Sequence, residues 1–567
     1  MSEKNPAPNG QEEQSWLRRQ WQRLRHAAWA DVVIAEVGAG AQNVAVGKNI
    51  FQLNVGGRNI TPYVLLIALA VLVIAGYFLY PLAEPLWNPW QMRGSLNIAV
   101  ADFGLLSDGR INPSALGADL SAAMYEELAV QYAEAKAATS AESRKTPISD
   151  VLIWHDTMPA ARGAKNVHFG VIEGATAQER SDAAAALAKR INANIVIYGY
   201  LTSDAVQEAL VLEFYYSSPA ISDEPDAAMG SHQMGAPIAS DLPLDDPQHA
   251  ATAKLQMSPG LNKRSAAVFW LTQAFSYDFA NQPEVALQIL QEAERRLGDW
   301  PNAEGKELLY LFLGRAALFA REFEEAIRAG ETALSINPDY VNAHVLLGLT
   351  YIDRAQLYFV RGRELTAEEA ACTSDKNIEQ SAQTVADALG DAQQAVAHLE
   401  QAARLAPASF WPPIEPYVRM NLGLAYRVLG LARIFAEEYE PAAAALQSAA
   451  GQLTTAAAAF PVQESPQYFA WTQMGLGLTY RLQAHLASVD EFVASQTGQA
   501  EAVAAARAET IALLGDSVNA YQSCINQKEA TLGYPVFQKK VLECSCIPYR
   551  ESAEKARQTL VEEGERE

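Results

Sequence analysis

Histidine and serine are the residues best suited to catalysis in this chain, but their spacing matches no familiar reaction centre. No histidine pair has the H-E-x-x-H spacing of a metalloprotease, and no serine stands in a G-x-S-x-G elbow. The eight histidines stand at positions 26, 155, 168, 232, 249, 344, 398 and 485. The sequence therefore predicts a protein that is not an enzyme, with no bound cofactor or metal.

The tripeptide Asp102-Phe103-Gly104 is a second candidate, because D-F-G holds magnesium in protein kinases. A kinase also needs a glycine-rich loop, a strand lysine and an H-R-D catalytic loop, and the sequence has none of these. The simpler interpretation is the end of a strand. Asp102 and Gly104 then turn the chain, and Phe103 packs inward.

The cysteines suggest a crosslink and not a metal site. Cys544 and Cys546 form a C-S-C with only one further cysteine in reach, too few ligands to favour a soft metal. Cys524 lies in a predicted helix, and a turn at residues 533–535 lets a second, antiparallel helix return Cys544 towards it. Outside the cytoplasm we expect a disulfide from Cys524 to either Cys544 or Cys546.

The first predicted element along the chain is an apolar run at residues 62–82. It is uncharged and long enough to cross the hydrocarbon of a bilayer, and aromatic residues stand near both of its ends. A cleaved signal peptide is the alternative, but the run begins some 60 residues into the chain and no small-x-small site follows it. We expect a single transmembrane helix that stays as an anchor.

The N-terminal tail, residues 1–61, has two features. The segment WLRRQWQRLRHAAW suits either an anionic membrane surface or a short solvated helix. The sequence GKNI and its repeat GRNI, among alternating apolar residues, predict small strands with tight turns.

Charge indicates both topology and partners. Arginines before the apolar run favour a cytoplasmic N-terminus, which places the bulk of the chain outside the cytoplasm. The formal net charge is −23, and an acidic protein repels the phosphates of nucleic acid. We therefore expect a single-pass membrane protein that does not bind nucleic acid.

Residues 94–217 alternate predicted strands and helices, which indicates a small α/β domain. The order of IAVADFG, a helix, a strand, a helix, ANIVIYGYL and a further strand resembles the TolB amino-terminal and CsgG-like domains of bacterial envelope proteins. Residues 218–262 are rich in proline, which predicts a linker or an irregular edge insertion.

The remainder repeats one phrase: LLGLTY ends at Tyr351, NLGLAY at Tyr426 and GLGLTY at Tyr480. Gly314 precedes Gly348 by 34 residues, and alanines follow at the spacing of a helix pair, so this region resembles the tetratricopeptide family. We expect an all-α solenoid of about five repeats over residues 263–550. Insertions, the largest at about 353–390, explain the uneven spacing, and residues 551–567 form a charged tail that caps the stack.

The tetratricopeptide resemblance also implies a protein-binding groove lined by the first helix of each pair. Carried over position by position, it selects Arg315, Asn342, Asp353, Tyr417, Met420, Arg427, Trp471, Met474 and Arg481. Arginines on an acidic body suit a carboxylate or an acidic peptide, although the alternative is that they pair with neighbouring acids.

Two functions remain. The chain is either a membrane-anchored scaffold for protein–protein interaction at the bacterial cell envelope, or a ligand-binding sensor or envelope-assembly factor whose α/β domain binds a small molecule. The absence of reacting groups favours the scaffold.

Overall fold

The computed structural model describes residues 53–55, 58–60, 91–140, 151–155, 169–203, 208–217, 230–279, 282–297, 301–302, 305–360, 384–409, 414–460, 462, 465–531 and 538–564. The chain divides into two compact units, Met1–Trp87 and Asn88–Glu567. The expected transmembrane helix at residues 62–82 and the basic segment of the tail lie outside the described residues. Within the described residues, no helix combines the length and apolar character needed to span a bilayer.

The first unit contains the strands expected from the GKNI and GRNI repeat. β1 (Leu53–Val55) and β2 (Arg58–Ile60) pair antiparallel, with Leu53 opposite Ile60. This pairing confirms the small strands predicted for the end of the tail.

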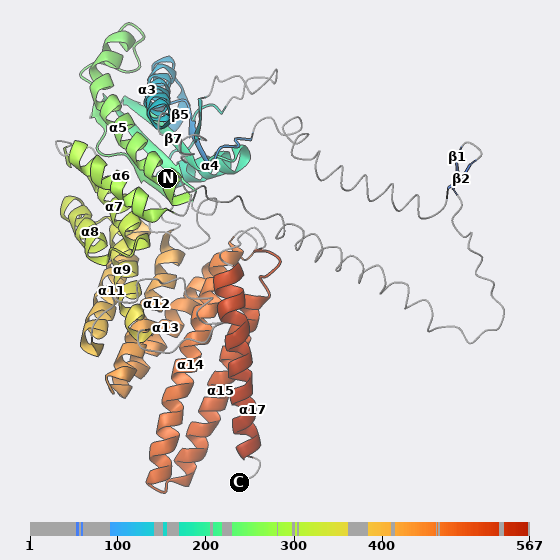
Figure 1. The fold of residues 1–567 in the computed structure, drawn as a ribbon. Helices are drawn as coiled ribbons and strands as arrows, with labels where there is room; N and C mark the ends of the chain where they lie inside the picture. Colours follow the sequence, from blue (N-terminus) through green and yellow to red (C-terminus); the bar gives the residue numbers. More distant parts are fainter. Residues whose placement is uncertain are drawn as a thin grey trace, which may run out of the picture. The chain divides into compact units, whose positions relative to one another are not determined.

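The second unit begins with a mixed β-sheet (Figure 1). The order of its strands is β10-β8-β7-β3-β6. β3 is parallel to both β6 and β7, whereas β7 and β8 are antiparallel. A hairpin of β4 and β5 joins the side of β7, and β9 joins β8. The strands are β3 (Leu96–Val100), β4 (Gly104–Ser107), β5 (Arg110–Pro113), β6 (Val151–His155), β7 (Ile195–Ser203), β8 (Glu208–Tyr216), β9 (Gly230–Gln233) and β10 (Ile238–Ala239).

Helices cover both faces of this sheet, so β3 is buried on both sides. Alternate residues of a strand point to opposite faces. Ile98 therefore packs with α3 (Ala115–Ser140) and α5 (Ala250–Phe279), whereas Ala99 packs with α4 (Ala177–Ile191). The expected α/β region is present, and Phe103 is fully buried, as predicted. Gly104 does not turn the chain as expected, because it begins β4, which continues along β7 in the same direction as β3.

Where the structure describes it, the proline-rich segment 218–262 is not a linker, but it adds strands at the edge of the sheet, which is the second of the two alternatives that the sequence left open. It supplies β9, β10 and the first part of α5, and Pro259 lies inside that helix. A proline in a helix interior costs about 3 kcal/mol. Its neighbours Met257 and Leu261 are fully buried in the core that the sheet and the helices share, and their burial offsets that cost.

The rest of the unit consists of consecutive helices that pack as pairs: α5 with α6, α7 with α8, α9 with α11, α12 with α13, and α14 with α15. Figure 1 shows them in chain order. Their bounds are α6 (Pro283–Arg296), α7 (Lys306–Phe319), α8 (Phe323–Ile336), α9 (Val341–Val360), α11 (Val385–Leu405), α12 (Ile414–Phe435), α13 (Tyr439–Ala459), α14 (Pro466–Gln496) and α15 (Ala500–Ile525).

Glycines of the repeated phrase allow each pair to pack closely. A Cβ added at Gly348 would lie 2.4 Å from Leu399, and one at Gly423 would lie 2.5 Å from Leu453. Both leucines belong to the second helix of the same pair. The helical region is therefore a tetratricopeptide-like solenoid, as the sequence predicts, with α9 and α11 flanking the expected insertion.

The C-terminal residues form packed structure and not a tail. A short 3₁₀ turn, η5 (Ala406–Ala408), follows α11, and a π-helical segment, η6 (Gln538–Cys546), leads into α17 (Ile547–Gly564). Ala553 of α17 is 1% exposed and packs with Ala484 and Leu514. The apolar face of α17 thus covers the last helix pair, as expected for a C-terminal segment that caps the stack, and it does so as a packed helix.

Candidate functional site

Four of the predicted groove residues lie in the interior, which corrects the position-by-position assignment. Arg315, Tyr417 and Met420 are at most 3% exposed, and Met474 is 8% exposed. The guanidinium of Arg315 lies 4.6 Å from the ring centroid of Phe319, and Tyr417 packs near Tyr468. Tyr417 and Met420 lie on α12 and Met474 on α14, helices of 22 and 31 residues that are longer than a regular 34-residue repeat of two helices predicts.

Three other predicted residues keep some exposure but do not come together. Asp353 forms an ion pair with Arg321 at 3.0 Å. Asn342 lies in the first turn of α9 and lines a pocket where the repeat helices meet the α/β region. Trp471 is half-buried and packs at the edge of the cluster that contains the Cys524–Cys546 disulfide.

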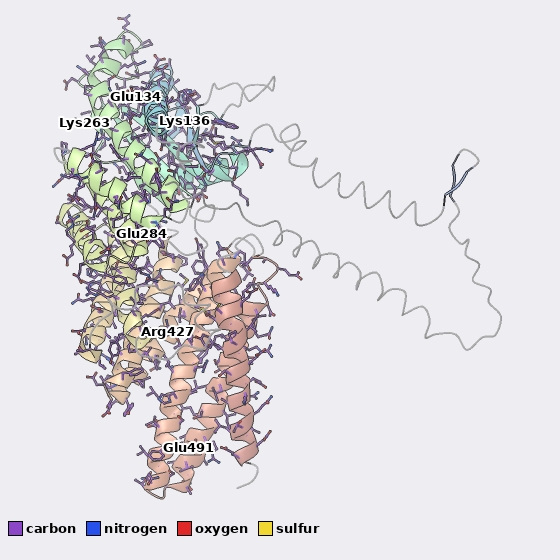
Figure 2. The ribbon with its side chains drawn as sticks, viewed as in Figure 1. Glu134, Lys136, Lys263, Glu284, Arg427 and Glu491 are labelled. Atoms are coloured by element: carbon purple, nitrogen blue, oxygen red, sulfur yellow. A yellow bond between two sulfur atoms is a disulfide. The ribbon has the colours of Figure 1, made fainter. Side chains whose placement is uncertain are left out.

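Arg427 and Arg481, in contrast, do belong to one cluster. Each directly follows the tyrosine of its repeated phrase, so the two arginines occupy the same place in successive repeats, on α12 and α14. Both lie near Tyr549 of α17: the Arg481 guanidinium is 5.3 Å from its ring centroid, and Tyr549 with Tyr521 influences the pKa of Arg427. Figure 2 labels Arg427 among the helices of the repeat region.

Tyr521 of α15 completes this arginine cluster, which we define as Arg427, Arg481, Tyr521 and Tyr549. The two tyrosine rings are 6.0 Å apart between centroids. Tyr521 is fully buried, and its ring fills the space beside Gly477, where an added Cβ would lie 2.6 Å from the ring. Tyr549 is 37% exposed, so the cluster reaches the surface at this residue.

The electrostatics of the arginine cluster are unusual for an acidic protein. Arg354 and Arg507 pair with carboxylates, but neither Arg427 nor Arg481 forms an ion pair with a described residue. The Nε of Arg427 is buried without a hydrogen bond to any described residue. Burial lowers the pKa of Arg427. A desolvated guanidinium without a counter-ion is costly, and a bound carboxylate would relieve that cost.

A disulfide holds the tyrosine side of the cluster. Cys524 and Cys546 are bonded, with their Cα atoms 6.4 Å apart, which is one of the two pairings that the sequence left open. Tyr521 precedes Cys524 by three residues, and Tyr549 follows Cys546 by three. The bond thereby ties α15 to the segment that leads into α17. Sequence reasoning missed both tyrosines, although Y-x-x-C and C-x-x-Y were visible signals.

Cys544 is disulfide-bonded as well. A bonded cysteine offers no thiolate to a metal. Among the described residues, no group of three or more His, Cys, Asp or Glu side chains could hold a metal ion.

One serine, histidine and aspartate do meet, at the carboxyl ends of β3 and β6. The Nε2 of His155 is 3.1 Å from the Oγ of Ser121 and 3.5 Å from the Oδ1 of Asp102. In a Ser-His-Asp triad the aspartate accepts a hydrogen bond from Nδ1 of the histidine, and Nε2 is hydrogen-bonded to the serine Oγ. Here both groups approach the same nitrogen and Ser121 is fully buried, so this arrangement does not activate a nucleophile.

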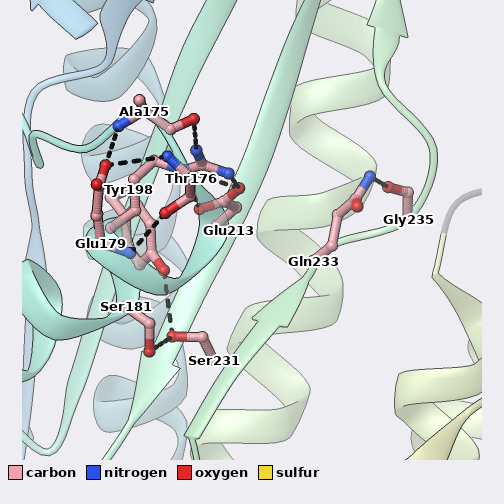
Figure 3. Close-up of polar contacts among 10 residues, drawn as sticks. Ala175, Thr176, Glu179, Ser181, Tyr198, Glu213, Ser231, Gln233 and Gly235 are labelled. Atoms are coloured by element: carbon pink, nitrogen blue, oxygen red, sulfur yellow. Dashed lines mark hydrogen bonds and ion pairs between the residues drawn. The ribbon is translucent and has the colours of Figure 1, made fainter. Parts of the chain in front are cut away.

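A second polar centre of the α/β region is structural. Arg180 of α4 donates to both carboxylate oxygens of Glu213 on β8, with its Nη2 2.6 Å from Oε1, and both side chains are buried. Tyr198 donates to Ser231, which donates to Ser181 (Figure 3). These contacts pin α4 to the sheet.

Comparisons with known proteins add little. No family model matches the chain, and no curated protein matches it. The chain is similar to the solved structure of a thermophilic TPR protein from Thermus thermophilus, with 14% sequence identity and a TM-score of 0.24. The match covers 48% of this chain and 97% of that chain. A similarity this weak carries no argument, so the description of the repeats rests on the helix pairs themselves.

Proposed function

We propose that this chain is a scaffold for protein–protein interaction, and that its arginine cluster binds an acidic or carboxylate-bearing segment of a protein partner. The observation that carries the proposal is the pair of guanidiniums without carboxylate counter-ions among the described residues, in a protein of net charge −23. Charge-assisted hydrogen bonds to a carboxylate are among the strongest that a side chain makes. The exposed edge of Tyr549 offers a neighbouring apolar contact.

A pull-down tests this proposal. Wild-type protein and the double variant Arg427→Glu/Arg481→Glu are compared for the proteins that they recover from a cell-envelope extract. The variant should lose the partners that the wild type retains, because its two new carboxylates repel an acidic segment. Equal recovery of the same partners by two folded proteins would show that the cluster is not the binding site.

The location of the scaffold is part of the same proposal. Residues 62–82 anchor it as a single transmembrane helix, with the N-terminus in the cytoplasm and the bulk of the chain outside it, at a bacterial cell envelope. The apolar run supports the anchor, and the Cys524–Cys546 bond supports an oxidising compartment. A reporter that is active only outside the cytoplasm should work when fused after Glu567 and be silent at the N-terminus, and the reverse pattern would contradict this topology.

The proposal includes no catalysis and no nucleic-acid binding. Its alternative, a sensor or assembly factor whose α/β region binds a small molecule, is favoured by the pocket that Asn342 lines at the edge of that region. The resemblance of the α/β region to TolB amino-terminal and CsgG-like domains stays a prediction.

A further inference from the structure

A pocket of about 340 Å³ lies where the α/β region meets the repeat helices. Its walls come from β9 and the turn after it, the first turns of α7 and α9, the turn between α8 and α9, and the end of η5. Figure 3 shows part of one wall, where Gln233 donates to the carbonyl of Gly235. A few hundred Å³ is the size of a small-molecule site.

The walls of this pocket are held in place without a ligand. The ring of His232 stacks on Phe214 with centroids 5.0 Å apart, and its Nδ1 lies 3.0 Å from the hydroxyl of Tyr340. A Cβ at Gly305 would lie 2.8 Å from the backbone nitrogen of Gly235, so the start of α7 touches the turn after β9. A site that is already formed binds its ligand with less loss of conformational entropy.

The lining of the pocket is polar in a particular way. Its described residues carry the amides of Gln233, Asn337 and Asn342, several hydroxyls and two carboxyl groups, but no lysine or arginine. Side-chain amides and hydroxyls both donate and accept hydrogen bonds, as the hydroxyls of a polyol do. This lining therefore matches a ligand that presents many hydroxyl groups.

Charge disfavours the other ligand classes. An anion would meet the carboxyl groups of Glu307 and Asp339, and the described lining has no lysine or arginine to offset them. Its one basic side chain, His232, already has Nδ1 3.0 Å from the hydroxyl of Tyr340. A cation would meet the amino-terminal ends of α7 and α9, which carry partial positive charge. Burial also raises the pKa of the Glu307 carboxyl, which weakens its pull on a cation.

We infer that this junction pocket binds a neutral polyhydroxylated small molecule, such as a sugar. The inference does not depend on the proposed scaffold, because the pocket shares no residue with the arginine cluster. It assigns a chemical class of ligand to the alternative function, that of a small-molecule sensor.

Ligand-observed NMR on the full chain tests the inference. A panel of neutral mono- and disaccharides is titrated to about 20 mM, a range in which weak specific binding still saturates. For the sugar that binds, the amino and carboxylate derivatives are then compared. We expect saturable binding of at least one neutral sugar and weaker binding of both charged forms.

Three variants locate the site. Asn342→Ala should weaken binding about tenfold, a loss of about 1.4 kcal/mol. Glu307→Gln should bind within about threefold of wild type, because an amide also accepts from a neutral hydroxyl and a cation site would instead lose its charge. Glu284→Gln, an equal charge change on an exposed residue of α6 labelled in Figure 2, is the control.

Three results of these titrations would contradict the sugar-binding pocket. The inference is overturned if no neutral sugar in the panel saturates, if either charged derivative binds more tightly, or if Asn342→Ala binds as wild type does. Arg427→Glu/Arg481→Glu should bind the sugar normally, so a failure of the scaffold proposal is distinguishable from a failure of this one.

Discussion

At the scale of single residues, the buried pair of Arg180 and Glu213 makes the most demanding contact of the α/β region. Removing one charge leaves the other buried without its counter-ion, which costs about 3 kcal/mol or more. We expect Glu213→Gln to lower the free energy of unfolding by about that amount, measured by urea unfolding of the full chain.

Glu292→Gln is the matched control for this prediction. Glu292 pairs with Arg295 and Arg296 on the surface of α6. Exposed ion pairs contribute much less to stability than buried ones, so Glu292→Gln should change the free energy of unfolding much less than Glu213→Gln does. Equal effects of the two substitutions would mean that the Arg180–Glu213 pair is not buried as described.

The two histidines of the repeat region give the protein a pH dependence. The Nδ1 atoms of His344 and His398 are 3.2 Å apart. Burial, and then the neighbouring His344, lower the pKa of His398 to about 4. The unfolded chain takes up a proton near the ordinary histidine pKa of about 6.5, so it binds more protons than the folded chain between these values and stability falls as the pH falls through that window.

We therefore expect wild-type protein to lose on the order of 1 kcal/mol more stability between pH 7 and pH 5 than His398→Gln does. This figure is smaller than the full shift implies because the side chain is partly exposed. Thermal unfolding of the two proteins across this range measures the difference. Parallel pH profiles would contradict the pairing of the two histidines.

At the scale of elements, the helix pairs depend on glycines at the points of contact. Gly348→Ala would push a methyl group into Leu399, and overpacking of this kind costs about 1 to 3 kcal/mol. Gly390, on the second helix of the same pair, has no atom within 4 Å of an added Cβ. Gly390→Ala should therefore stabilise the protein by about 0.5 to 1 kcal/mol.

The two glycine substitutions should change the stability of the protein in opposite directions, so each serves as a control for the other. Thermal unfolding of the full chain should give a lower midpoint for Gly348→Ala and a higher one for Gly390→Ala. A neutral Gly348→Ala would show that α9 and α11 do not pack as the structure has them.

The Cys524–Cys546 bond stabilises the junction between α15 and α17. It closes a loop with a sequence separation of 22 residues, and closing a loop of that size contributes about 3 kcal/mol. Cys524→Ser/Cys546→Ser should lower the unfolding midpoint and speed proteolysis at α17. An unchanged midpoint with unchanged proteolysis would mean that packing alone holds α17.

The sequence predicts the individual helices and strands better than it predicts which of them pack together. The strand at VLIWH follows from its run of apolar residues, and the close contacts at Gly348 and Gly423 follow from the spacing of the repeated phrase. The β4–β5 hairpin was missed although its signal is present: Asp108 and Gly109 both have positive φ, as an Asp-Gly hairpin turn requires. Pro259 inside α5 could not be predicted from local sequence. The helix tolerates this proline because burial of its apolar residues in the core shared with the sheet offsets the destabilisation.

At the scale of the whole molecule, the site was predictable in part. Arg427 and Arg481 follow from the repeated phrase, since equal places in successive repeats come close. Tyr521 and Tyr549 do not follow from it, because a disulfide and a C-terminal helix outside the repeat pattern bring them in. The 34-residue template likewise does not predict the burial of Tyr417 and Met420, which lie on the 22-residue helix α12.

The affinity for an acidic peptide shows whether the arginine cluster binds carboxylates. Fluorescence anisotropy of a labelled peptide of aspartate and glutamate is compared for wild type, Arg427→Gln/Arg481→Gln and a control, Arg419→Gln/Arg433→Gln. The control arginines lie on α12, as Arg427 does, but they contact Glu415 and Glu438. A charged hydrogen bond contributes about 1.5 to 3 kcal/mol, so the first variant should bind at least about tenfold more weakly and the control within about twofold. Equal affinities for the first variant and wild type would contradict the claim that the arginine cluster binds carboxylates.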